Sequence, residues 1–123
     1  MNIGIATKSY AIDNFRDFNG RASRWEYWGG GLAFSLISVF ADTIAETTYS
    51  IALLLLIIIF YIWAIIASLS ASIRRLHDLG KSGWNLLWTF TFFGIFYLLY
   101  LYVQPSVQKD NEWGAPPPHT IEI

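Results

Sequence analysis

The sequence predicts an all-α membrane protein with three transmembrane helices, preceded by a short amphipathic N-terminal helix. Two observations carry this prediction: an apolar composition, and charges gathered into clusters separated by long uncharged runs. Of the 123 residues, 54% are hydrophobic and only 14% are charged, against roughly 25% charged in an ordinary soluble domain. A chain this short cannot bury so much apolar surface inside itself. Much of that surface must therefore face lipid.

The uncharged runs give the expected spans. A helix needs about 20 apolar residues to cross a hydrocarbon core of roughly 30 Å. The runs lack the alternation of barrel strands, so helices are the structure that satisfies their backbone polar groups in lipid. We expect a cytoplasmic amphipathic segment over 1–22, a transmembrane domain over 23–104 with spans at about 25–45, 49–73 and 83–103, and a polar tail over 105–123.

The basic residues predict the orientation. Lys8, Arg16, Arg21 and Arg24 precede the first span, and Arg74, Arg75 and Lys81 follow the second, whereas the loop between these spans has only acidic charges. Because Lys and Arg are enriched in cytoplasmic loops, the N-terminus is expected in the cytoplasm and the C-terminus in the periplasm. The predicted location is a bacterial inner membrane, crossed several times.

Small residues recur at helical spacing within the first two spans. Gly31, Ser35 and Ser38 share one stripe of the first, and Ala64, Ser68 and Ser72 share one stripe of the second. Small residues let helices approach closely in lipid. We therefore expect these two stripes to pack together. The third run is crowded with Phe and Tyr and is expected to face lipid or a partner.

Local signals mark the ends of the spans on the basic side. Ser23 and Glu26 form a capping-box pattern at the start of the first span. Arg74, Arg75 and His77 fall in the last turn of the second, where cations complement the helix dipole. Gly80 is expected to end that helix in a left-handed conformation, and Ser82 to cap the third span.

The charged side chains at these ends have two interpretations. The first is a topological anchor with internal pairs, in which Glu26 lies near Arg74 or Arg75 and in which Arg21 and Arg24 lie near Asp78. The second is a site for an anion, either a lipid headgroup or a soluble phosphate. The basic residues of that site would be Arg21, Arg24, Arg74, Arg75 and Lys81, while Ser23, Glu26, His77 and Asp78 would serve in capping and ion pairs.

Other chemistry is poorly supported by the sequence. Adjacent residues on a helix point about 100° apart, so His77 and Asp78 do not form a catalytic dyad by themselves. The chain has no cysteine, and its histidines and carboxylates are too scattered for a metal site. We expect no catalytic residue, metal or cofactor, no enzymatic activity and no nucleic-acid partner.

Three stretches resemble a known family. Residues 18–28, which read F-N-G-R-A-S-R-W-E-Y-W, are similar to the F-x-G-R-x-x-R-x-E-[FY]-W opening of the bacterial inner-membrane family of domain of unknown function 805, DUF805. Residues 74–84, R-R-L-H-D-L-G-K-S-G-W, resemble its R-R-L-H-D-x-G-x-S-G-W signature, and residues 111–114, N-E-W-G, resemble its N-x-[YFW]-G tail. The resemblance implies a multi-spanning inner-membrane protein and no particular mechanism.

Two functions follow from these patterns as expectations. The first is a non-enzymatic accessory component that contacts the phospholipid bilayer and its anionic headgroups, alone, as a homo-oligomer or in a larger membrane complex. The alternative is an oligomeric channel or transporter for a small solute. Intramembrane ionisable residues, which mark solute pathways, are not expected in this chain, and this favours the first function.

Overall fold

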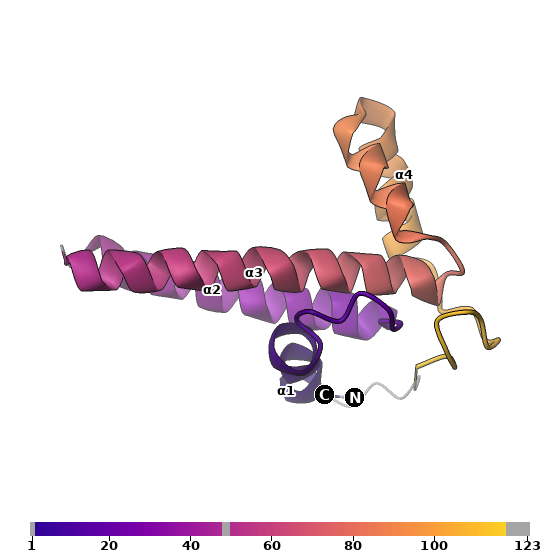
Figure 1. Cartoon of the computed structure of the whole chain (residues 1–123), viewed down its shortest axis with the longest axis horizontal. Coiled ribbons are helices and arrows are strands. Elements are labelled where there is room, and N and C mark those ends of the chain that lie inside the picture. The colour runs from indigo at the N-terminus through magenta and orange to yellow at the C-terminus, as the bar shows by residue number, and fades with distance from the viewer. Residues whose placement is uncertain (1, 48–49, 118–123) are drawn as a thin grey trace.

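The computed structural model describes residues 2–47 and 50–117, and the described part is mainly helical. The chain begins with α1 (Ile3–Lys8), which a π-helical turn, η1 (Ser9–Asp13), continues. A second π-helical turn, η2 (Glu26–Gly30), leads into α2 (Gly31–Glu46), and α3 (Ile51–Asp78) runs back beside it (Figure 1). The remaining elements are a 3-10 helix, η3 (Gly83–Phe90), and α4 (Phe92–Tyr102).

Two helices are long and apolar enough to cross a membrane. They are Glu26–Glu46, in which η2 and α2 form one continuous helix, and α3, with mean hydropathies of 1.3 and 2.9. At 1.5 Å per residue, the 28 residues of α3 extend about 42 Å, which exceeds a hydrocarbon core of roughly 30 Å. The buried residues of α3 all lie between Ala67 and Asp78. The last turns of α3 are therefore the packed part of the molecule.

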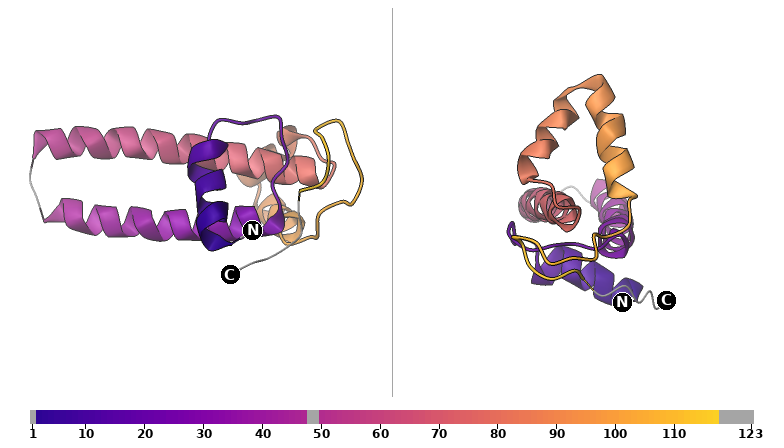
Figure 2. Two further views of the ribbon diagram at one scale, coloured as in Figure 1. Left: turned by 90° about the horizontal axis from the view of Figure 1, so that it is seen from below. Right: turned by 90° about the vertical axis from the view of Figure 1, so that its right-hand side faces the viewer.

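The expected third span is not one helix. The run 83–103 is divided at Thr91, whose backbone is extended (φ −119°, ψ 146°) and whose hydroxyl accepts a hydrogen bond from the Gly94 amide at 3.0 Å. A Cβ at Gly94 would lie 2.1 Å from the Thr91 hydroxyl oxygen, so the turn requires glycine there. The two halves form a hairpin (Figure 2), and α4, with 11 residues or about 16 Å, is too short to cross.

The hairpin changes where the tail lies. It projects sideways from the α2–α3 pair at the end where α2 begins and α3 stops (Figures 1 and 2). Residues 103–114 consequently return to this same end, where they contact Arg21, His77 and Asp78. The prediction that a third span carries the tail to the opposite end from Lys81 is wrong. Residues 118–123, including His119, lie outside the described residues.

The N-terminal helix lies across α2 and α3 rather than apart from them. It ends at Asp13, with Ala6, Tyr10 and Ala11 as its buried face. Glycine makes the crossing possible, since a Cβ at Gly30 would lie 2.6 Å from the Ala6 carbonyl oxygen. Ile5 and Ile12 remain exposed on the other face of this helix.

Tyrosines occupy the space that the small-residue stripes leave. The Tyr10 ring covers Gly31, and its hydroxyl lies 3.1 Å from that of Ser68. The Tyr27 hydroxyl lies 3.4 Å from that of Ser72. The stripes therefore accommodate tyrosine side chains at Gly31, Ser68 and Ser72, and direct packing of one stripe on the other stays a prediction. Between α2 and α3 lies an aromatic cluster of Phe34, Phe60 and Trp63.

Candidate functional site

The carboxylate of Asp78 is the centre of a buried ion-pair network at the end of α3. Its side chain is 0% exposed. Arg21 approaches one carboxylate oxygen with Nε at 3.1 Å and Nη2 at 3.0 Å, and Arg75 donates to the other from Nη1 at 2.6 Å. Ser106 of the tail also donates to this second oxygen. One carboxylate thus joins the loop before α2, the end of α3 and the tail.

The two arginines extend the network along the tail through backbone carbonyls. Arg21 donates to the carbonyl oxygens of Lys109 at 2.8 Å, Val107 at 2.6 Å and Gly114 at 3.1 Å. Arg75 donates to the carbonyl oxygen of Tyr102 at 3.3 Å and to that of Gln104. These bonds fix the end of α4 and the residues that follow it against α3.

The turn at 111–114 completes this attachment. The Asn111 side chain donates to the His77 carbonyl oxygen at 2.9 Å, and the Trp113 ring stacks on the His77 ring with 4.1 Å between centroids and 5° between planes. Gly114 has φ +116°, a conformation that side chains disfavour, and its carbonyl is one of the acceptors for Arg21. The first and second family-like stretches therefore meet the third in one place.

A second buried pair joins Glu26 to Arg74. Arg74 Nη1 lies 2.8 Å from Glu26 Oε1, and the Ser9 hydroxyl donates to the same oxygen at 2.8 Å. Ser23 caps the helix as expected, since its hydroxyl accepts from the Glu26 amide at 3.1 Å. The Glu26 carboxylate, however, faces Arg74 and Ser9 and does not close the capping box. It links η1, η2 and α3.

The five basic residues of the predicted anion site are divided between interior and surface. The side chains of Arg21, Arg74 and Arg75 are 2%, 1% and 0% exposed. Arg24 and Lys81 are exposed, and Arg24 donates one hydrogen bond, from Nη1 to the Val103 carbonyl oxygen at 3.0 Å. Arg21 pairs with Asp78 as predicted, whereas Arg24 lies at the end of α4 instead.

Backbone carbonyl oxygens offset the excess of positive charge in the interior. Three buried guanidinium groups face two buried carboxylates, Glu26 and Asp78. In the second interpretation of the sequence, a bound anion would balance this surplus. The carbonyl oxygens of the tail supply partial negative charge to Arg21 and Arg75 instead. Arg74 keeps two buried nitrogens, Nε and Nη2, without a hydrogen-bond partner in the part of the chain that is described.

Adjacency of His77 and Asp78 does not produce an acid–base pair here. His77 Nδ1 faces the Gly20 carbonyl oxygen at 3.0 Å, while the Asp78 oxygens face Arg21, Arg75 and Ser106. Among residues 2–47 and 50–117, no three His, Asp or Glu side chains are grouped as metal ligands would be. The arrangement is suited to holding segments together.

Sequence reasoning missed the side chains with which the tail and η1 join the network. It treated the tail as a separate, extended segment, so the roles of Ser106, Asn111 and Trp113 were not anticipated, nor was Ser9 as a partner of Glu26. The available signal was the third family-like stretch itself. An Asn, an aromatic residue and a glycine in a short polar tail indicate a specific turn rather than a loose end.

Comparison with known proteins decides the family. The model of the family described as "Protein of unknown function (DUF805)" matches residues 15–115. The chain belongs to the DUF805 family. The match includes every residue of the Asp78 network and begins after η1, so that α1 and η1 lie outside it.

Curated relatives of this DUF805 protein agree with the match. The chain is 30% identical over 107 residues to inner membrane protein YhaI of Escherichia coli strain K12, covering 86% of this chain and 90% of that protein. The same protein of Escherichia coli O157:H7 matches to the same extent. No solved structure matches the chain.

Proposed function

We propose that this DUF805 protein is a non-enzymatic accessory component of the bacterial inner membrane that binds anionic lipid headgroups of the cytoplasmic leaflet through Arg24 and Lys81. The observation that carries the proposal is the position of these two exposed cations at the base of an apolar hairpin. Lys81 lies just before η3, where the hairpin begins. Arg24 donates a hydrogen bond to the carbonyl oxygen of Val103, just after α4, where the hairpin ends. The location rests also on the name of the relative, an inner membrane protein.

The charge distribution supports a cytoplasmic location for this end. Most of the eight Lys and Arg lie in segments that gather at this end, and Lys109 returns to it with the tail. Lys8 lies farther along the pair, beside Ile37 and Phe60. Asp42 and Glu46, near the other end of α2, have no basic residue beside them in the chain. Basic residues are enriched on the cytoplasmic side of membrane proteins. With two crossing helices, the N-terminal segment and residues 103–117 both lie in the cytoplasm.

The surface of the hairpin supports its insertion into lipid. Phe90, Phe93 and Trp84 are 86%, 82% and 79% exposed. In water this aromatic surface would be unfavourable, since apolar burial contributes about 25 cal/mol per Å². Because the hairpin extends sideways from the spanning helices, it lies within the leaflet on whose side it starts. Its base is then at the depth of the headgroups.

Exposure explains why Arg24 and Lys81, rather than the arginine pair of α3, serve as the lipid contact. Arg75 donates to Asp78, Tyr102 and Gln104, and its side chain is 0% exposed. A headgroup phosphate could reach it only after the tail had separated. Arg24 and Lys81 need no such rearrangement. Each basic residue near an anionic leaflet contributes on the order of 1 kcal/mol.

The test compares two charge-matched double variants in nanodiscs that contain phosphatidylglycerol. Arg24→Gln with Lys81→Gln is expected to weaken retention of phosphatidylglycerol, measured by native mass spectrometry, by roughly 10- to 30-fold. The control, Arg16→Gln with Lys109→Gln, removes the same charge from exposed positions elsewhere at this end. It is expected to change retention less than threefold.

Equal loss in the two double variants would contradict the proposal, because it would show a response to net charge alone. Retention that is unchanged in both would contradict it as well. The same spectra report oligomeric state. A symmetric oligomer without retained lipid would favour the alternative function, an oligomeric channel for a small solute, which stays a prediction.

A further inference from the structure

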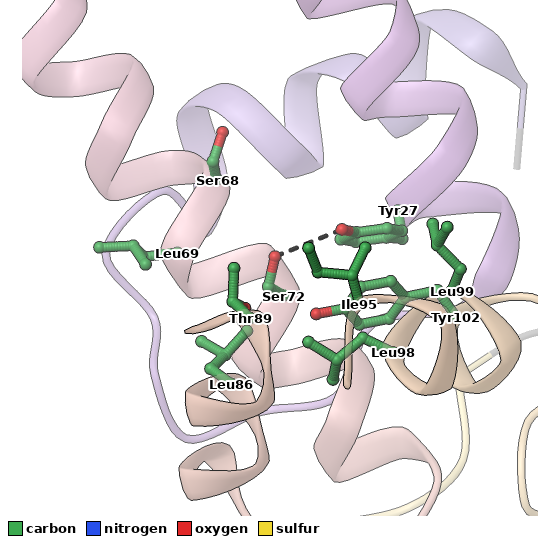
Figure 3. A pocket seen from close by; sticks show the side chains of 10 residues that line it. All are labelled: Tyr27, Ser68, Leu69, Ser72, Leu86, Thr89, Ile95, Leu98, Leu99 and Tyr102. Carbon is green, nitrogen blue, oxygen red and sulfur yellow. Dashed lines mark hydrogen bonds between the residues drawn. The ribbon is translucent and has the colours of Figure 1, made fainter. Parts of the chain in front are cut away.

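A cavity lies between α3 and the hairpin, next to the charged network, with which it shares Tyr102. Its volume is about 320 Å³, and residues of η2, α3, η3 and α4 line it (Figure 3). Leu69 on α3 and Leu99 on α4 belong to its wall and are 46% and 45% exposed. The cavity therefore opens on the face of the molecule that the proposed topology places in lipid.

Five hydroxyl groups belong to the lining of this cavity, and none of the residues that line it carries a charge. They are those of Tyr27, Ser68, Ser72, Thr89 and Tyr102. The Tyr27 and Tyr102 rings lie against each other with 4.6 Å between centroids and 34° between planes, and the Tyr27 hydroxyl reaches Ser72 at 3.4 Å (Figure 3). Hydroxyls on an otherwise apolar wall select a neutral ligand with a few polar atoms.

The hydroxyl groups indicate which polar atoms the ligand carries. A hydroxyl has one hydrogen to donate and two lone pairs. The hydroxyls of Tyr27, Ser72 and Tyr102 lie within hydrogen-bonding reach of one another, and each can instead turn its hydrogen toward a bound ligand. A carbonyl oxygen, which only accepts, complements hydroxyls that donate.

The volume indicates a compact ring system. A cavity of about 150 Å³ lined by apolar side chains binds benzene, and small-molecule pockets begin at roughly 300 Å³. A volume of 320 Å³ holds one or two fused or linked rings. A longer apolar tail would leave through the open side into the bilayer.

We propose that this cavity binds a neutral, lipid-soluble ring compound that carries carbonyl oxygens, such as an aryl ketone or the head of a quinone. Ser72, with Tyr27 and Tyr102 beside it, donates to a carbonyl, while Leu98 and Ile95 pack against the ring. The site rests on the membrane topology of the proposed function but does not involve Arg24 or Lys81, so it is tested separately from headgroup binding.

Benzophenone is a suitable probe, because it has two rings and one carbonyl and attaches to nearby C–H bonds on irradiation. The full-length protein in nanodiscs is irradiated with benzophenone, and the attachment sites are mapped by mass spectrometry. Labelling is expected to concentrate on residues 68–72, 86–89 and 95–102. Decylubiquinone, whose ring carries carbonyls, is expected to displace the label at least fivefold better than decylbenzene, which has no oxygen.

Variants test the hydroxyls. Ser72→Ala and Tyr102→Phe are each expected to reduce labelling of the cavity by about 2- to 10-fold. The controls are Ser38→Ala, whose hydroxyl bonds the Phe34 carbonyl on α2, and Tyr97→Phe, on α4 but outside the cavity. Both controls should leave the labelling unchanged.

Two outcomes would overturn the proposal. Labelling spread evenly over α2, α3 and the hairpin would show that no site exists. Labelling of the cavity that decylbenzene displaces as well as decylubiquinone does would show a gap for acyl chains without use of the hydroxyls. The competition uses the unaltered protein, so the result does not depend on whether a variant folds.

Discussion

Replacing Asp78 by Asn should release the tail while leaving the membrane helices in place. The substitution keeps the size of the side chain and removes the charge that Arg21 and Arg75 share at 3.0 and 2.6 Å. Both pairs are almost fully buried, so solvent screening does not weaken them. Loss of one partner from a buried ion pair costs about 3–5 kcal/mol.

The magnitude can be followed at one peptide bond. The carbonyl of Lys109, where trypsin would cleave, is the acceptor for Arg21 Nη1 at 2.8 Å, so cleavage requires the tail to open. If the lower figure of about 3 kcal/mol applies to that opening, the open population rises about 100-fold, since 1.4 kcal/mol is a factor of ten. Cleavage by trypsin under conditions of fast reclosing follows that population.

The assay is limited trypsin digestion of full-length protein in nanodiscs, with the rate of cleavage after Lys109 measured by mass spectrometry. Asp13→Asn is the matched control, because Asp13 pairs with Lys8 at 3.9 Å with both side chains at least half exposed. Surface pairs contribute about 0–1 kcal/mol, and that pair does not hold the tail. A rate for Asp78→Asn within threefold of the unaltered protein would refute the reasoning.

Three further outcomes are expected. A periplasmic alkaline phosphatase fused after Pro117 should be inactive, and one inserted between α2 and α3 should be active; activity after Pro117 would restore a third crossing. Gly30→Ala should detach the N-terminal helix, because its Cβ would lie 2.6 Å from a backbone oxygen of α1 at a cost of about 1–3 kcal/mol. Hydrogen exchange over residues 3–13 measures the detachment. The control Gly4→Ala, whose Cβ would make ordinary contacts, should change the exchange little. Trp113→Ala should increase cleavage after Lys109 by about 2- to 10-fold through loss of the stacked His77 contact, whereas Trp84→Ala, at an exposed position, should not; equal rates in the two would contradict that role.

The sequence alone determined the features that depend on neighbours in the chain. The charge-free runs identified α2 and α3, because a helix that crosses lipid needs a continuous apolar stretch. Local capping was predicted at Ser23 and Ser82, and the positive φ of Gly80 was predicted from the end of α3. The ends of two spans at one interface lie at the same depth, which predicted Glu26 beside Arg74 or Arg75 and both Arg21 and Arg24 beside Asp78. The structure forms Glu26–Arg74 and Arg21–Asp78, while Arg24 bonds Val103 instead. The family was recognised from the same stretches.

The tertiary structure decided whether the third apolar run forms one helix or two. Phe and Tyr on either side of Thr91 are equally compatible with one long helix and with a hairpin, because composition indicates hydrophobicity but not where the chain reverses direction. A threonine cap followed by a glycine with no room for a Cβ produces the reversal. That reversal brings the tail back to the charged end, and with it the carbonyl oxygens that satisfy Arg21 and Arg75.

The structure therefore also decided which basic residues are exposed and free to contact an anion. Counting charges along the chain placed five cations in one cluster, since a sequence shows the charge of a side chain but not its acceptors. Backbone carbonyls belong to every residue and give no signal in the sequence until folding aims them at a donor. Arg21 and Arg75 are enclosed by such carbonyls and Arg74 by Glu26, whereas Arg24 and Lys81 stay at the surface. Hydrophobicity and charge along the chain specified the membrane helices and the charged end, and the packing of distant segments specified what that end can bind.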